Sequence, residues 1–120
     1  GDKGVFLSSG EAQRVCVARA ILKNAPILVL DEATAFADPE NEYKMQQALK
    51  SLIKDKTVII IAHRLSSIVS SDRIIVLKDG KAVQCGRHEE LSSQEGVYKK
   101  MWNAYTSAFR WQLNVKQEKE

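Results

Sequence analysis

Apolar and polar positions occur in blocks along the chain, and the spacing within each block predicts its secondary structure. Residues 8–23 place apolar side chains every three or four positions, which predicts a helix with serines available as caps. Residues 27–30 form an unbroken apolar run that stops at Asp31-Glu32. Residues 57–62 form another, which stops at His63-Arg64. Short runs of this kind are typical of strands buried on both faces of a parallel sheet.

Two further helices are predicted in the middle of the chain. Asp38 followed by Pro39 favours a helix start, because proline suits the first helical position, and the apolar spacing continues to about residue 54. A shorter helix is predicted over residues 65–69. Helices and strands are therefore expected to alternate.

The last third of the chain combines a hairpin with a long helix. Residues 74–77 predict a third strand, and the turn sequence Lys78-Asp79-Gly80-Lys81 predicts that residues 82–84 return beside it. From Val97 onward the apolar positions follow helical spacing, as in an amphipathic helix packed on its own domain. The order of elements predicts an α/β fold with a mostly parallel sheet flanked by helices and a C-terminal helical tail.

Composition narrows the class of protein. The chain has 120 residues and a net charge of +3, with acidic and basic residues interleaved, which does not predict a nucleic-acid partner. The most apolar run, residues 58–62, is far shorter than the roughly 20 residues of a membrane helix. We therefore expect a soluble piece, with any membrane part located elsewhere.

Two adjacent carboxylates, Asp31 and Glu32, end the first predicted strand. The carboxyl ends of parallel strands form the edge of a sheet where ligands bind. Neighbouring strand residues point to opposite faces, so one carboxylate can hold Mg²⁺ through water while the other orients or deprotonates an attacking water. Taken alone, the pair fits a strand that simply ends in a polar loop better than a catalytic site, because Asp-Glu pairs are common.

The start of the first predicted helix has the composition of an anion site. Small residues there let the backbone approach a phosphate, which the partial positive charge and unpaired N–H groups of a helix N-terminus attract. Read alone, the same residues are an ordinary capped turn. The residues concerned are Ser8, Ser9, Gly10 and Glu11.

These features occur in one order, and their combination resembles the ATP-binding cassette family over about residues 4–100. Residues 7–11, Leu-Ser-Ser-Gly-Glu, are similar to the signature motif of that family, and residues 27–31 to its Walker B strand. Glu32 matches the catalytic glutamate, and His63 matches the switch histidine at the end of a neighbouring strand.

The resemblance implies the C-terminal part of a P-loop NTPase-type domain over residues 1–92, followed by a helical extension over residues 93–120. It implies that Glu32 and His63 act in ATP hydrolysis and that Asp31 holds Mg²⁺, through water. Asp38, in the place of the D-loop, is expected to couple two such sites. The residues expected to contact ATP held by a second domain, in a homodimer or heterodimer, are Ser8, Ser9, Gly10 and Glu11.

The sequence departs from the family pattern at a few positions and lacks one motif. Ser9 replaces a usual glycine, Glu11 replaces the more usual glutamine, and Phe36-Ala37 replaces alanine and leucine in the D-loop. No G-x-x-x-x-G-K-[ST] phosphate loop occurs in the sequence. We therefore expect a fragment that is inactive by itself.

Residues 72–80, 86–91 and 96–98 are similar to the exporter branch, in which the cassette follows a membrane domain on the same polypeptide. Residues 33–42 and the aromatic tail further resemble bacterial exporter-type proteins, some of them linked to iron-siderophore uptake. The resemblance implies an ATPase at the cytoplasmic face of the cell membrane, with the transmembrane domain of the same transporter as a partner. The alternative is a soluble ABC ATPase of DNA repair or chromosome maintenance, against which the Gly-x-His-Glu-Glu-Leu sequence at 86–91 argues.

Overall fold

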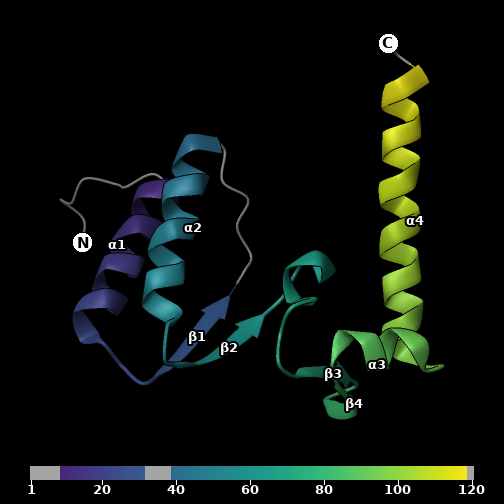
Figure 1. The fold of residues 1–120 in the computed structure, drawn as a ribbon, viewed down its shortest axis with the longest axis horizontal. Coiled ribbons are helices and arrows are strands. Elements are labelled where there is room, and N and C mark those ends of the chain that lie inside the picture. Colours follow the sequence, from purple (N-terminus) through teal and green to yellow (C-terminus); the bar gives the residue numbers. More distant parts are fainter. Residues whose placement is uncertain (1–8, 32–38, 119–120) are drawn as a thin grey trace. The chain divides into compact units, whose positions relative to one another are not determined.

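Figure 1 shows the chain as a computed structural model that describes residues 9–31 and 39–118. The chain divides into two compact units, Gly1–Ile61 and Ala62–Glu120. In the described residues, each unit has its own pair of strands and its own helices. The expected α/β class and C-terminal helix are confirmed.

The first unit is built around a parallel strand pair. Helix α1 (Ser9–Lys23) is followed by β1 (Ile27–Asp31), and helix α2 (Pro39–Ile53) by β2 (Thr57–Ile61). Strands β1 and β2 pair in parallel from Ile27 opposite Thr57 to Asp31 opposite Ile61. A parallel pair needs a crossover between its strands, and α2 lies in that crossover.

One face of this strand pair is packed and the other is open. Leu28 of β1 and Leu52 of α2 are buried, and both helices lie to the same side of the strands in Figure 1. The large apolar side chains of β1 and β2 that remain exposed by half or more are Ile27, Val29, Ile59 and Ile61. The prediction of burial on both faces is therefore wrong for these strands, because the described residues supply helices on one side only.

The second unit begins with a 3-10 turn, η1 (Leu65–Ile68), and an antiparallel hairpin of β3 (Ile74–Lys78) and β4 (Lys81–Gly86). Asp79 and Gly80 between the strands have φ angles of 52° and 76°. Two positive φ angles in a two-residue loop are the type I′ geometry, which the Asp-Gly pair favours. The third predicted strand, β3, thus pairs in antiparallel with β4, the strand that follows it. The parallel pairing in the described residues is that of β1 with β2.

Two helices complete the second unit, α3 (His88–Ser93) and α4 (Val97–Glu118). Helix α3 is not predictable from the sequence pattern, because six residues are too few to show helical periodicity. The core combines Ile74 and Val76 of β3 with Leu91 of α3 and Tyr98 of α4. The partly buried apolar residues that pack against this cluster are Leu65, Ile68, Val97 and Trp102.

Tyr98 is the residue that ties α4 to the hairpin. Its side chain is 1% exposed, and its backbone N–H donates to Gln84 Oε1 at 2.9 Å. Its hydroxyl lies 2.8 Å from His88 Nδ1, within hydrogen-bonding distance. Burial, and secondarily the charge of Glu89, raise the pKa of the Tyr98 phenol, so the neutral form that can share a proton with His88 is favoured.

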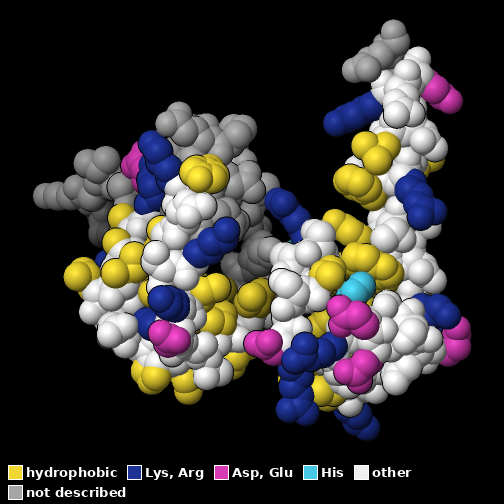
Figure 2. All heavy atoms as spheres, viewed as in Figure 1, with side chains coloured by type: hydrophobic (Ala, Val, Ile, Leu, Met, Phe, Trp, Pro, Cys, Tyr) yellow, Lys and Arg dark blue, Asp and Glu magenta, His cyan; other side chains and the backbone are white. Residues whose placement is uncertain are grey.

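The second half of α4 leaves apolar side chains in solvent. Phe109, Trp111 and Leu113 are 54%, 68% and 47% exposed, and Figure 2 shows hydrophobic side chains along this part of the helix. The expectation of a helix packed on its own domain therefore holds for its first turns. Within residues 9–31 and 39–118, no helix combines the length and apolarity needed to cross a bilayer.

Gly96 sets the approach of α4 to Gln84, which gives a test of this packing. A Cβ atom at Gly96 would lie 2.5 Å from Gln84 Nε2, so Gly96→Ala must displace the side chain that accepts the N–H of Tyr98. We expect Gly96→Ala to lower the free energy of unfolding by about 1–3 kcal/mol. Gly86→Ala is the matched control, because its Cβ would have only ordinary contacts of 3.4 Å or more. Equal unfolding midpoints in urea for the two variants would contradict this packing.

Candidate functional site

The carboxyl end of β1 places Asp31 at the edge of the parallel pair. Asp31 is exposed, and its α carbon is the register partner of that of Ile61, the last residue of β2. His63, also exposed, follows Ile61 by two residues. Two chain steps keep the α carbon of His63 within about 7 Å of that of Ile61. Asp31 is thus the last residue of β1, and His63 follows the last residue of its partner strand β2 by two positions.

The start of α1 is the second part of the predicted site. Ser9 opens the helix, Gly10 is partly exposed, and Glu11 is an exposed acid of the first turn. A Cβ atom added at Gly10 would meet only Arg14, at 3.8 Å. Among the described residues, little therefore crowds the backbone at Gly10, which is the condition that phosphate binding to a helix N-terminus requires.

Three predicted site residues, Ser8, Glu32 and Asp38, lie outside the described residues. Of the other two predicted catalytic or metal-binding residues, Asp31 belongs to the first unit and His63 to the second. The roles assigned to these residues from the resemblance therefore stay predictions, with the strand register as their structural support.

Asp31 is compatible with a magnesium ion held through water. Mg²⁺ in nucleotide sites is usually bound by one or two carboxylates together with water and phosphate oxygens. Asp31 supplies one exposed carboxylate at a strand end, and no group of three or more potential ligands occurs in the part of the chain that the structure describes. One exposed carboxylate at a strand end fits an ion that is shared with water and phosphate oxygens.

The groups with shifted pKa values in the described residues belong to the second unit and mark local contacts. Lys99 lowers the pKa of the exposed Glu95 carboxyl through an ion pair one helical turn away. A hydrogen bond from Arg73 Nε to Cys85 Sγ, 2.8 Å long, raises the pKa of the Arg73 guanidinium. Neither pair touches the predicted site, so these shifts report packing of the second unit.

Sequence reasoning assigned no role to the residues that follow His63. Leu65 and Ile68 of η1 pack against the buried cluster of the second unit. The available signal was two apolar residues three apart, a spacing too short to distinguish a structural turn from a surface helix. The contact that they make depends on α4, about 30 residues further along the chain.

Comparison with known proteins identifies the family. The family model described as "ABC transporter" matches residues 2–35, which include the signature-like segment and β1. The mycobactin import ATP-binding/permease protein IrtA of Mycolicibacterium thermoresistibile is 55% identical over 101 residues, which are 84% of this chain and 11% of that protein. The ATP-dependent lipid A-core flippase of Pseudoalteromonas translucida is 55% identical over 98 residues, 82% of this chain and 17% of that protein.

A solved structure carries the same fold. The structure of a bacterial Atm1-family ABC exporter with ATP bound aligns with a TM-score of 0.69 and 43% sequence identity, covering 82% of this chain and 17% of the exporter chain. The chain therefore spans less than a fifth of the length of these relatives. The fold, the family model and the identity over most of the chain agree with the resemblance in the motifs, and the chain belongs to the ATP-binding domains of ABC transporters.

Proposed function

We propose that the chain forms the C-terminal half of the ATP-binding and ATP-hydrolysing domain of an exporter-type ABC transporter. The observation that carries the proposal is the register of β1 and β2. It pairs Asp31 with Ile61, two residues before His63 in the chain, which supports the proposal that Asp31 and His63 act as metal-binding and switch residues. In the reaction, water adds to the γ-phosphorus of ATP, the bond from that phosphorus to the bridging oxygen breaks, and ADP and phosphate leave.

Each residue of this set has a distinct part in the proposed reaction. Asp31 would hold Mg²⁺ through water, and the ion would supply positive charge that neutralises the phosphates. Glu32, the next residue, orients the attacking water and accepts its proton. His63 hydrogen-bonds both the water and the γ-phosphate and so holds them in line.

A second copy of such a domain completes the site in this proposal. The backbone of α1 at Gly10, with Ser8, Ser9 and Glu11, contacts the γ-phosphate of an ATP molecule held by the partner domain. The open surroundings of Gly10 support this contact, because the helix N-terminus can then reach the anion. Asp38 couples the two sites across the dimer. ATP binding therefore drives dimerisation, and hydrolysis releases it.

The open face of the first unit supports a further partner within the same domain. Parallel sheets in α/β proteins are covered on both faces, whereas Val29 and Ile59 are 63% and 52% exposed. We propose that this face and the free strand edges pack against the half of the domain that carries the phosphate-binding loop. The first turns of the extension over residues 93–120 supply Tyr98 to the core of the second unit.

The transmembrane part of the same transporter is the proposed partner outside the ATPase domain. Relatives are named as ATP-binding/permease proteins and flippases, which supports a domain at the cytoplasmic face of a membrane and gives no support to a DNA-repair ATPase. The names include an import protein and an exporter, so "exporter-type" here describes the architecture, and no direction of transport is proposed.

Glu32→Gln in the intact transporter tests the assignment of the base. The amide keeps the shape of the side chain but cannot accept a proton, so we expect ATP binding to persist and hydrolysis to fall by about 10²–10⁴-fold. The dimer of ATP-binding domains should then remain closed with ATP bound. Steady-state turnover at the wild-type rate would show that Glu32 is not the base.

His63→Ala tests the switch role separately. Loss of the imidazole should lower kcat by roughly a hundredfold, because a hydrogen bond to the transferring phosphate is lost, while the affinity for ATP changes little. The measurement is phosphate release at saturating ATP, with nucleotide binding measured on the same sample. Full activity of the variant would remove His63 from the mechanism.

The 120-residue chain by itself should not bind ATP at micromolar concentrations. Without the phosphate-binding loop, the phosphates lack their main set of N–H donors and its lysine. Isothermal titration of the chain with Mg-ATP measures this directly, and the intact domain is the positive control. Micromolar affinity of the chain alone would mean that the site does not depend on the loop.

A further inference from the structure

The segment that follows His63 is held by short local contacts. His63 precedes Arg64, which is the extended residue at the start of η1, with φ −120° and ψ 123°. The backbone N–H and the hydroxyl of Ser67 both donate to the carbonyl oxygen of Arg64, at 3.2 and 2.7 Å. These two hydrogen bonds close the turn. Because Arg64 follows His63 directly, the position of the turn constrains the backbone at His63.

The turn is fixed to the second unit by two apolar side chains. Leu65 and Ile68 are partly buried and pack against the core cluster that includes Tyr98 of α4. Leu65 is two residues from His63, so a displacement of this contact is carried to His63 by only two chain steps. The two hydrogen bonds from Ser67 to Arg64 join residues of the same turn.

The first turns of α4 form the other side of this contact. Tyr98 is 1% exposed and is bonded to both Gln84 and His88. Trp102 packs against the same cluster, and its ring stands edge-on to that of His88 with 4.5 Å between centroids. Aromatic pairs in this arrangement contribute beyond their buried area, so α4 presents a fixed apolar surface to the cluster.

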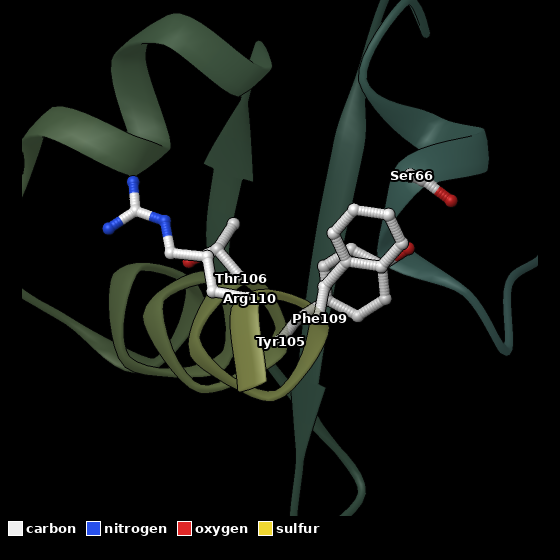
Figure 3. Close-up of a pocket in the computed structure, with 5 residues that line it drawn as sticks. All are labelled: Ser66, Tyr105, Thr106, Phe109 and Arg110. Atoms are coloured by element: carbon white, nitrogen blue, oxygen red, sulfur yellow. The ribbon is translucent and has the colours of Figure 1, made fainter. Parts of the chain in front are cut away.

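One turn further along α4, a hollow separates the helix from η1. The volume of this hollow is about 320 Å³. Figure 3 shows the rings of Tyr105 and Phe109 on the side of α4 toward Ser66, and the guanidinium of Arg110 on the side away from Ser66. The residues that line it are Ser66, Tyr105, Thr106, Phe109 and Arg110. On this side η1 borders the hollow, and the packing of Leu65 and Ile68 joins the turn to the core cluster.

We propose that α4 is a positioning element for His63. Trp102 and Tyr98 hold the cluster against which Ile68 and Leu65 pack, and these two residues hold the chain at His63. The inference rests on the proposed role of His63 in hydrolysis and adds residues that act through it. Loosening this contact misplaces the imidazole without removing it, so the chemical step slows while nucleotide binding is kept.

The test uses the intact transporter and two matched pairs of variants. Trp102→Ala is compared with Trp111→Ala, on the same helix but 68% exposed, and Ile68→Ala with Ile75→Ala, which is 58% exposed. We expect the first member of each pair to lower kcat by about ten- to a hundredfold with little change in KM for ATP, and the second to match wild type. Ile68→Val should recover most of the turnover. Equal kcat within each pair would overturn the proposal.

A double variant separates positioning from a general loss of stability. If Ile68 acts through His63, then Ile68→Ala in the His63→Ala background should cost no further turnover. Losses that multiply would overturn the proposal, because Ile68 would then act by another route. If Trp102→Ala does not fold, Trp102→Phe is judged by the same comparison with Trp111→Phe. Unchanged turnover in His63→Ala alone would instead remove the proposed function of His63.

Discussion

The parallel register of β1 and β2 is the constraint on which the site depends. Asp31 pairs with Ile61, so the end of β1 lies opposite the end of β2. Side chains alternate along a strand, and a slip of one residue would turn Asp31 to the other face of the sheet and change which residue follows the end of the pair. Leu28 of β1 and Leu52 of α2 are buried, and burial of one face of a strand pair favours a single register.

The second unit gives the structure a separate means of placing His63. Its core depends on one aromatic residue, Tyr98, whose ring is buried while its N–H and hydroxyl are both within hydrogen-bonding distance of side chains of the hairpin and α3. Burying a hydroxyl without a partner would cost free energy, and His88 supplies that partner. The turn after His63 packs on this core, so a C-terminal helix without any of the family's motifs becomes relevant to the site.

Much of the local structure is predictable from the sequence, and the reason is that it depends on local patterns. Residues 27–30 and 57–62 predict β1 and β2 to within one residue, and Asp79-Gly80 predicts the hairpin turn because both residues tolerate positive φ. The exposure of Val29 was not predictable, because burial of a strand depends on what lies across from it. The burial of Tyr98 was equally inaccessible, since it requires Gln84, 14 residues away, and the absence of a side chain at Gly96. Ser8, Glu32 and Asp38 fall outside the described residues, so their placement is still a prediction.

The central claim is that Asp31, Glu32 and His63 surround one nucleotide while Ser8 faces the nucleotide of a partner domain. A structure of the intact transporter with Mg-ATP bound tests it most directly. The account predicts His63 within about 3 Å of the γ-phosphate or of the attacking water, Asp31 joined to the magnesium ion by at most one water, and Ser8 against the ATP of the other domain. An imidazole of His63 turned away from the nucleotide, or Ser8 buried inside its own domain, would contradict it.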